Sequence, residues 1–129
     1  PETSQIPGVR VGAPAALAAA AMGAGPDAHI LVMTHDHNLD YALTSAALAG
    51  GAFGYLGLIG SETKKARFLS RLRKDGFGDG TVARVTCPIG LPGVGGKLPA
   101  EIAIATAAQL LQRRGAAAAG GAAQPEVAE

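Results

Sequence analysis

The stretch His29-Ile30-Leu31-Val32-Met33-Thr34-His35-Asp36-His37 joins a short apolar run to four consecutive polar side chains. An apolar run of this length with β-branched members is typical of a strand that is buried on both faces, as in a parallel sheet. Immediately after it, apolar residues recur at helical spacing: Leu39, Ala42, Leu43, Ala46 and Ala47. The polar cluster is therefore expected where a strand ends and a helix begins, which is where open α/β sheets bind ligands.

The same arrangement recurs along the chain. Residues 55–59 predict a second buried strand, and Ser61 is a suitable N-cap for a helix from about Glu62 to Lys74. A short strand at 9–11 and a helix over 15–22 precede these elements, and a strand over 82–86 follows them. Pro99 opens a last helix, which is expected to end near Gln112 and to be well buried. This order predicts one parallel sheet of three or four strands with helices on both faces.

Composition narrows the classes of function. The chain has 129 residues, enough for one domain, with 48% hydrophobic and 16% charged residues. The formal net charge of +1 excludes a broad electrostatic attraction to nucleic acid or to membranes, and no stretch approaches the length of a bilayer-spanning helix. Because Cys87 is the single cysteine, no internal disulfide can form, and a reducing, cytoplasmic location is expected. Cys87 is either a reactive thiol or a small buried hydrophobe.

The composition changes near residue 115. Residues 1–114 contain all the predicted elements and form one domain in this interpretation. Residues 115–129 are rich in alanine and glycine without periodicity, and they are predicted to be a flexible tail. The sequence begins at Pro1, with neither an initiator methionine nor a signal-peptide pattern, which suggests a fragment of a longer protein.

The first junction carries two imidazoles on either side of a carboxylate, in His35-Asp36-His37. Such a group can bind a metal, exchange protons or hydrogen-bond a polar ligand. A metal site needs a third ligand, and the remaining candidates form no recognisable ligand spacing. We favour contact with a ligand, Thr34 included, over the alternative in which Asp36 caps the following helix and the histidines lie on a loop surface.

The second junction, at Gly60 and Ser61, offers backbone N–H groups and the positive end of a helix dipole. These suit an anion, to which Lys64 or Lys65 would add charge, although an ordinary capped helix is the alternative. Gly57, inside the preceding strand, suggests the close approach of another backbone or a ligand. Lys97, at the start of the last helix, is a further polar contact. Both junctions are expected side by side at one edge of the sheet.

Four motifs, in order, resemble the C-terminal Rossmann-type domain of the XdhC/CoxI family. They are VMTHDH at 32–37, GLIGS at 57–61, PIGL at 88–91 and KLPAEIA at 97–103, and the resemblance covers roughly residues 9–111. The family consists of accessory, or maturation, proteins of xanthine dehydrogenase and carbon monoxide dehydrogenase. The family domain normally opens with a strand, a glycine-rich turn, a helix and a second strand. The resemblance therefore implies a partial Rossmann-like three-layer fold that lacks the first βαβ unit.

The resemblance also implies a function. Family members are understood to bind the molybdenum cofactor (molybdopterin), to support its sulfuration and to hand it to the apo-dehydrogenase, acting as cofactor chaperones more than as catalysts. The implied partners are the molybdenum subunit of an apo-xanthine or CO dehydrogenase and a cysteine desulfurase. No catalytic residue is expected. The expected cofactor-binding residues come from both junctions: Thr34, His35, Asp36, His37, Gly57, Gly60, Ser61, Lys64 and Lys97.

Three further expectations accompany this one. An NAD(P)- or nucleotide-binding oxidoreductase-like domain is an alternative, against which stands the absence of a correctly placed glycine fingerprint. A ligand-free docking module is another, because the predicted helix over 62–74 carries six of the eleven basic residues and would suit an acidic partner protein. Finally, without a first βαβ unit one sheet edge is exposed, so a homodimer or a strand-exchanged arrangement is expected.

Overall fold

The computed structural model describes residues 7–8 and 11–120, the last six of these as backbone only. The chain folds in the order α1 (Pro14–Met22), β1 (His29–Val32), α2 (His37–Gly50), β2 (Tyr55–Leu58), α3 (Glu62–Lys74), α4 (Asp79–Val82), β3 (Val85–Thr86) and α5 (Pro99–Gly120). Both predicted strand–helix junctions are therefore confirmed. Asp36 caps α2 and Ser61 caps α3, each by accepting hydrogen bonds from backbone N–H groups of the first turn.

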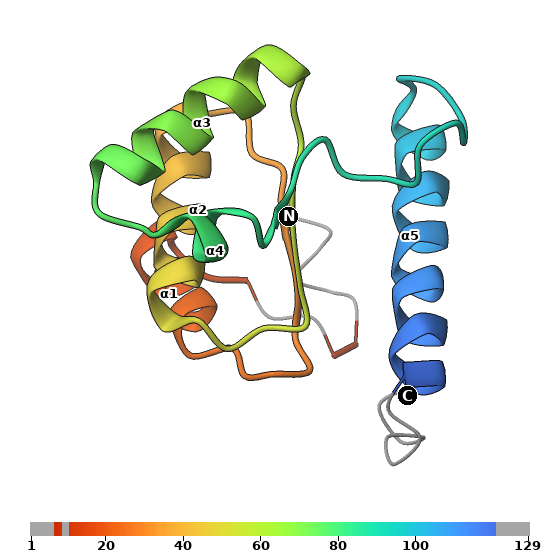
Figure 1. The fold of residues 1–129 in the computed structure, drawn as a ribbon, viewed down its shortest axis with the longest axis horizontal. Helices are drawn as coiled ribbons and strands as arrows, with labels where there is room; N and C mark the ends of the chain where they lie inside the picture. Colours follow the sequence, from red (N-terminus) through yellow and green to blue (C-terminus); the bar gives the residue numbers. More distant parts are fainter. Residues whose placement is uncertain (1–6, 9–10, 121–129) are drawn as a thin grey trace.

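The three strands form one parallel sheet in the order β1-β2-β3. His29 pairs with Tyr55, and Leu56 pairs with Val85. Helices α1, α2 and α3 lie on one side of this sheet and α5 on the other (Figure 1). The result is the α/β, partial Rossmann-like three-layer arrangement that the sequence predicts.

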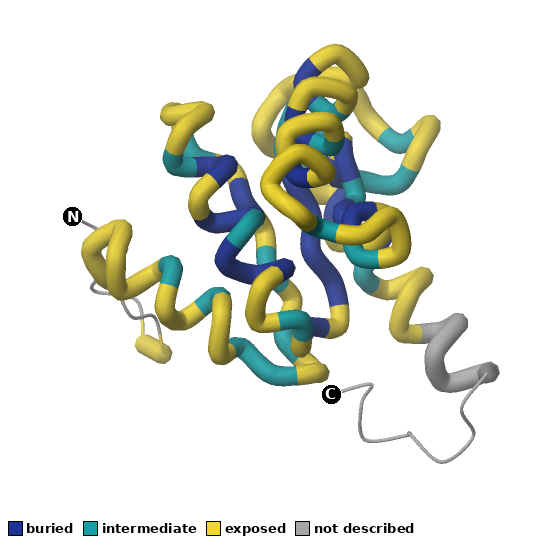
Figure 2. Tube along the Cα trace, turned by 60° about the vertical axis from the view of Figure 1, so that its left-hand side comes forward, coloured by how far each residue is buried: buried dark blue, intermediate teal, exposed yellow. Residues whose placement is uncertain are grey.

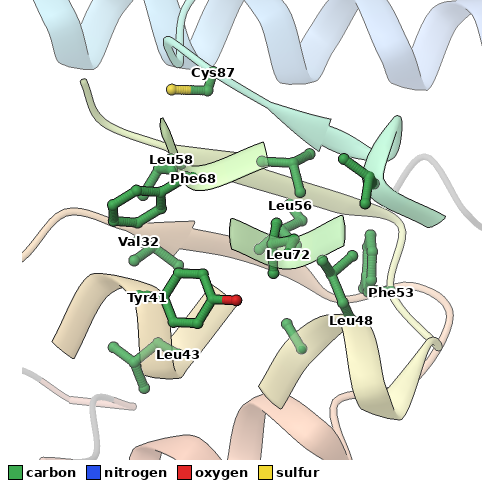
Figure 3. Close-up of a cluster of buried hydrophobic side chains, with 13 residues drawn as sticks. Val32, Tyr41, Leu43, Leu48, Phe53, Leu56, Leu58, Phe68, Leu72 and Cys87 are labelled. Atoms are coloured by element: carbon green, nitrogen blue, oxygen red, sulfur yellow. The ribbon is translucent and has the colours of Figure 1, made fainter. Parts of the chain in front are cut away.

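The hydrophobic core fills the space between the sheet and the helices α2 and α3. Because side chains alternate across a strand, Leu56 and Leu58 of β2 point into this layer, where both are fully buried. Phe68 and Leu72 of α3 and Tyr41 of α2 pack against them (Figure 3). The buried residues concentrate on β2 and on the inner face of α2, whereas α1 is exposed along most of its length (Figure 2). This core holds the two junctions at a fixed separation.

The prediction that the last helix is well buried is wrong. Helix α5 meets the sheet through one narrow stripe, in which Ala105 and Gln109 are buried, whereas Ile104 is 63% exposed and Leu111 58% exposed. The physical reason is the small sheet: β3 has only two residues, so one helix face suffices to cover it. Despite its length and apolar character, α5 does not qualify as a membrane-crossing helix, and neither does any other helix among the described residues.

Other predicted bounds either differ from those in the structure or involve residues that the structure does not describe. The strand predicted over 82–86 is shorter, because residues 79–82 form α4. Helix α5 runs on to Gly120 instead of ending near Gln112, since the alanines at 116–119 are the strongest helix formers and offset Gly115. The predicted tail thus begins within this helix, and its remainder, 121–129, lies outside the described residues. Residues 9 and 10 of the strand predicted at 9–11 also lie outside them, and the domain boundary at 114 stays a prediction.

Candidate functional site

The ends of β1 and β2 lie side by side, as the sequence predicts. Val32 pairs with Leu58 in the parallel ladder, and the N–H of Ile59 donates to the carbonyl of Val32 over 3.0 Å. The loop between β1 and α2, residues 33–36, contains Thr34, and the turn between β2 and α3, residues 59–61, contains Gly60 and Ser61. The two polar junctions therefore occupy neighbouring positions at the carboxyl edge of the sheet.

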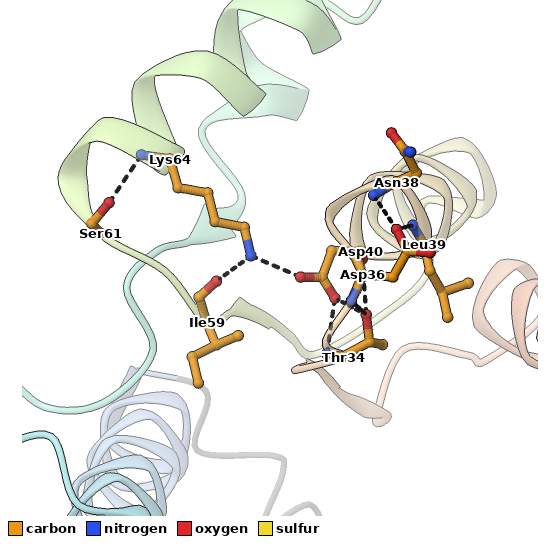
Figure 4. A network of polar contacts seen from close by, with 8 residues as sticks. All are labelled: Thr34, Asp36, Asn38, Leu39, Asp40, Ile59, Ser61 and Lys64. Atoms are coloured by element: carbon orange, nitrogen blue, oxygen red, sulfur yellow. Dashed lines mark hydrogen bonds and ion pairs between the residues drawn. The ribbon is translucent and has the colours of Figure 1, made fainter.

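A buried ion pair joins the two junctions (Figure 4). The ammonium of Lys64, in the first turn of α3, lies 2.7 Å from Oδ2 of Asp40 in the first turn of α2, and only 7% and 1% of these side chains are exposed. The same ammonium donates to the carbonyl of Ile59 over 2.8 Å. Lys64, which we expected to contact the cofactor, is therefore engaged by the protein itself and points into the interior.

Asp40 organises the loop after β1. Its Oδ1 accepts hydrogen bonds from the backbone N–H of Thr34 over 2.9 Å and from the Thr34 hydroxyl over 2.7 Å. Burial opposes ionisation of this carboxyl, but the hydrogen bonds from Lys64 and Thr34 outweigh burial and lower the pKa of Asp40 below its ordinary value of 3.8. The carboxylate form is thus the one that the fold stabilises.

The predicted site residues did not include Asp40, although its position on the apolar face of the predicted helix indicated a buried, paired carboxylate. Asp40 shares one helical face with Leu43 and Ala47, which are both buried. A carboxylate on the apolar face of a helix needs a buried cationic partner. The first turn of the neighbouring helix, which contains Lys64, was the place to look for that partner.

Asp36 acts as a helix cap, which was the alternative interpretation of its role. Its Oδ1 accepts from the N–H of Asn38 over 2.8 Å and from the N–H of Leu39 over 3.3 Å. The side chains on either side, His35 and His37, are exposed, and neither imidazole hydrogen-bonds to any residue that the structure describes. Their ring nitrogens are consequently available to a ligand, while Asp36 holds the backbone between them.

Gly57 makes room for side chains of the chain itself. A Cβ atom at this position would lie 2.5 Å from Cγ2 of Ile89 and 2.6 Å from the ring and hydroxyl of Tyr55. The Tyr55 hydroxyl lies 2.5 Å from Oε1 of Gln109 on α5, and Gln109 also bonds both the N–H and the carbonyl of Gly90. The atoms nearest to Gly57 therefore belong to the side chains of Ile89 and Tyr55, where the sequence suggested another backbone or a ligand.

Gly60 has a similar internal role. A Cβ atom there would lie 2.5 Å from Cδ of Lys64. The absence of a side chain at Gly60 lets the aliphatic part of Lys64 pass over the turn on its way to Asp40. Ser61 follows as the cap of α3, with its hydroxyl oxygen accepting from the N–H of Lys64 over 3.2 Å.

A cavity of about 340 Å³ opens beside this turn. Its wall brings three of the predicted residues together, Gly60, Ser61 and Lys97. The remaining wall is mostly apolar and is formed by Ile59, Pro88, Ile89, Gly96 and Ile102. The N-terminal N–H groups of α3 and the exposed Lys97 both favour a negatively charged group in this cavity.

The described residues give little support to a metal site or to a reactive thiol at Cys87. Within the described part of the chain, no group of three or more His, Cys, Asp or Glu residues is placed to hold a metal ion. Cys87 is buried in the core, and this burial raises the pKa of its thiol, which disfavours the reactive thiolate. Cys87 therefore behaves as a small buried hydrophobe.

Comparison with known proteins gives one family and one relative. The family model described as "XdhC Rossmann domain" matches residues 2–110. A curated protein of Escherichia coli (strain K12) with the name "Uncharacterized protein YqeB" is 34% identical over 87 residues. That alignment spans 67% of this chain but only 15% of YqeB.

Proposed function

This chain belongs to the XdhC Rossmann-domain family, and on that premise we propose that it acts as an accessory factor in the maturation of xanthine dehydrogenase-type molybdenum enzymes. In this role the chain binds the molybdenum cofactor, assists its sulfuration and delivers it to the apo-dehydrogenase. It is a cofactor chaperone more than a catalyst. The cytoplasm, where the apoenzyme is made, is the corresponding location.

The observation that carries this proposal is the cavity beside the second junction. It combines a mostly apolar wall with the N-terminus of α3 and with Lys97. Small-molecule sites typically pair an apolar lining with a few well-placed polar groups. A pterin phosphate has the matching chemistry, because its phosphate suits the helix N-terminus and the lysine ammonium. The donor set of this cavity therefore fits the phosphate end of the cofactor.

The first junction supplies the second set of contacts. His35 and His37 expose ring nitrogens that donate to or accept from the polar edge of a bound ring system. Thr34 and Asp36 act indirectly, because their hydrogen bonds hold the loop in place. Lys64 and Gly57 contribute in the same indirect way, through the packing of the residues around the site.

Sulfuration and delivery require protein partners. We propose a cysteine desulfurase and the molybdenum subunit of the apo-dehydrogenase in these roles. The exposed basic residues of α3, Arg67 and Lys74 among them, provide a surface that suits an acidic region of either partner.

The test is a retention assay with molybdenum cofactor as the probe. The chain is incubated with the cofactor and desalted, and the retained pterin is oxidised to its fluorescent derivative and measured. Lys97→Ala and the double variant His35→Ala/His37→Ala are compared with the parent. Lys74→Ala is the matched control, because it removes an exposed lysine on α3 away from the cavity.

We expect the parent and Lys74→Ala to retain the cofactor and the other two variants to lose most of it. Equal retention by all four proteins would contradict binding at the carboxyl edge of the sheet. Loss of the bound pterin on addition of NAD(P), together with tight binding of the dinucleotide, would favour the nucleotide-binding alternative. No retention by the folded parent would overturn the proposal for this chain.

A further inference from the structure

The carboxylate of Glu101, in the first turn of α5, holds the backbone on both sides of Lys97. Its Oε1 accepts hydrogen bonds from the N–H of Gly96 over 3.1 Å and from the N–H of Leu98 over 3.4 Å. Lys97 lines the 340 Å³ cavity of the candidate site, whereas Glu101 does not. Glu101 thus reaches the site through the segment that carries Lys97.

Two glycines before Lys97 make room for this carboxylate. A Cβ atom at Gly96 would lie 2.8 Å from Oε1 of Glu101, and one at Gly95 would lie 3.0 Å from Cβ of Glu101. Gly95 also has a φ of +69°, in the left-handed region that favours glycine. The backbone of this loop therefore packs closely against Glu101 because both positions carry no side chain.

The contact constrains a segment that is otherwise free to move. Three of the four residues at 93–96 are glycines, which lose more backbone freedom on ordering than any other residue. By joining the N–H of Gly96 to that of Leu98, the carboxylate restrains the backbone dihedral angles of Gly96 and Lys97 that lie between them. Without this restraint, an anion that binds Lys97 has to order the segment itself, and that cost weakens binding.

We propose that Glu101 is a positioning residue, whose carboxylate orders the backbone at Lys97 so that the lysine ammonium meets the anionic group of the ligand. This inference rests on the proposed function, in which that group is the phosphate of the molybdenum cofactor. Charge alone predicts the opposite effect, because a carboxylate beside an anion site repels the anion. The sign of the change in affinity when Glu101 is removed therefore separates the two effects.

The experiment measures the dissociation constant of the molybdenum cofactor by equilibrium dialysis, with the pterin on each side oxidised to its fluorescent derivative. Lys97→Ala is expected to raise this constant about tenfold, as the loss of one hydrogen bond from a charged group does. Glu101→Ala should raise it by a similar factor, although the lysine is intact. Asp79→Ala, which removes an exposed carboxylate from the first turn of α4, is the control and should leave it unchanged.

A pair of variants of similar length tests whether the accepting oxygen is what matters. Glu101→Gln keeps a side-chain oxygen that accepts from Gly96 and Leu98, and it is expected to retain most of the affinity of the parent. Glu101→Met lacks that oxygen and should behave like Glu101→Ala, which it replaces if the alanine variant does not fold. Circular dichroism establishes that each variant is folded.

A double variant tests whether Glu101 acts through Lys97. In Glu101→Ala/Lys97→Ala no ammonium remains to be positioned, so the dissociation constant should equal that of Lys97→Ala alone. A role in the stability of α5 alone would lower the free energy of unfolding of Glu101→Ala and leave its dissociation constant at the value of the parent.

Three results would overturn the inference while the proposed function stands, in a parent that binds the cofactor and is weakened by Lys97→Ala. The first is a folded Glu101→Ala or Glu101→Met that binds at least as tightly as the parent. The second is a Glu101→Gln as weak as Glu101→Met, and the third is a double variant weakened by the product of the two single factors. A parent that does not bind the cofactor would overturn the proposed function, and this inference with it.

Discussion

The ammonium of Lys64 and the carboxylate of Asp40, 24 positions apart in sequence, meet at 2.7 Å in the interior of this domain. Each comes from the first turn of a helix that follows a strand of the sheet. Through Thr34 on one side and the carbonyl of Ile59 on the other, the pair fixes both junctions relative to each other. A candidate site built from two separate loops therefore rests on one buried contact.

Breaking this pair should be costly. Asp40→Ala leaves a buried ammonium without its partner, and we expect a loss of about 3–5 kcal/mol in the free energy of unfolding. The measurement is urea denaturation. Asp79→Ala is the control, because it breaks the Arg73–Asp79 pair, whose side chains are 54% and 89% exposed, and should cost less than about 1 kcal/mol. Similar losses in the two variants would contradict a structural role for the buried pair.

Replacing both partners at once should reduce the free energy of unfolding by less than the sum of the losses in the two single variants. In Asp40→Leu/Lys64→Met no charge remains in the interior, and apolar replacements of buried ion pairs are often tolerated. We expect the double variant to be more stable than Asp40→Ala, as measured by the same urea titration. A double variant that loses the sum of both single effects would show that the pair does not act as a unit.

The pair also predicts a dependence of stability on pH. The folded state lowers the pKa of Asp40 below 3.8. The stabilisation is therefore complete above that value and is lost as the pH falls through the lower pKa of the folded state. We expect urea midpoints of the parent to decline in this acidic range more steeply than those of Asp40→Asn, which has no proton to gain at this position. Parallel declines in the two proteins would contradict the prediction.

Tyr41 makes the corresponding prediction for alkaline solution. Burial, and then the hydrogen bond of its hydroxyl to Asp75 over 2.5 Å, raise the pKa of Tyr41 to about 12. The resulting stabilisation is present below the ordinary value of 10.0 and is lost as the pH rises toward 12. In an ultraviolet titration, Tyr41→Phe should remove the ionisation step near 12. If Tyr41 instead ionised with the ordinary tyrosine pKa of 10.0, its hydroxyl would not be held by Asp75.

Gly57 should not tolerate a side chain. In Gly57→Ala the new methyl group would lie 2.5 Å from Cγ2 of Ile89 and 2.6 Å from the Tyr55 ring, so either these side chains shift or the strand distorts. We expect a loss of about 1–3 kcal/mol in the free energy of unfolding. Gly80→Ala is the control, since nothing lies near its added methyl group in α4, and it should be neutral or stabilising by up to about 1 kcal/mol. A Gly57→Ala variant as stable as the parent would contradict the tight packing of Ile89 and Tyr55 over Gly57.

Much of the fold could be predicted because its signals are local. The apolar run of β1, the cap at Asp36 and the helical spacing that follows it are all read from neighbouring residues, and so are β2, Ser61 and α3. The parallel sheet followed from the order of these elements. The positions of the two junctions at one edge followed in turn, because parallel strands end together.

The roles of individual side chains were less predictable. Lys64 and Gly57 were expected at the ligand, but one points to Asp40 and the other lies beneath Tyr55. The exposed face of α5 was expected to be buried. Each of these outcomes depends on which partner, distant in sequence, comes within contact distance.

By itself, the sequence determined the elements, their order and the chemistry available at the two junctions, because hydrogen bonding within a helix turn and the alternation of a strand act over a few residues. Only the tertiary structure decided which groups are left for a ligand. The buried carboxylate of Asp40 is stable only with a cationic partner, and Lys64 is that partner, so its side chain points into the interior. Lys97, His35 and His37 have no such buried partner and are exposed.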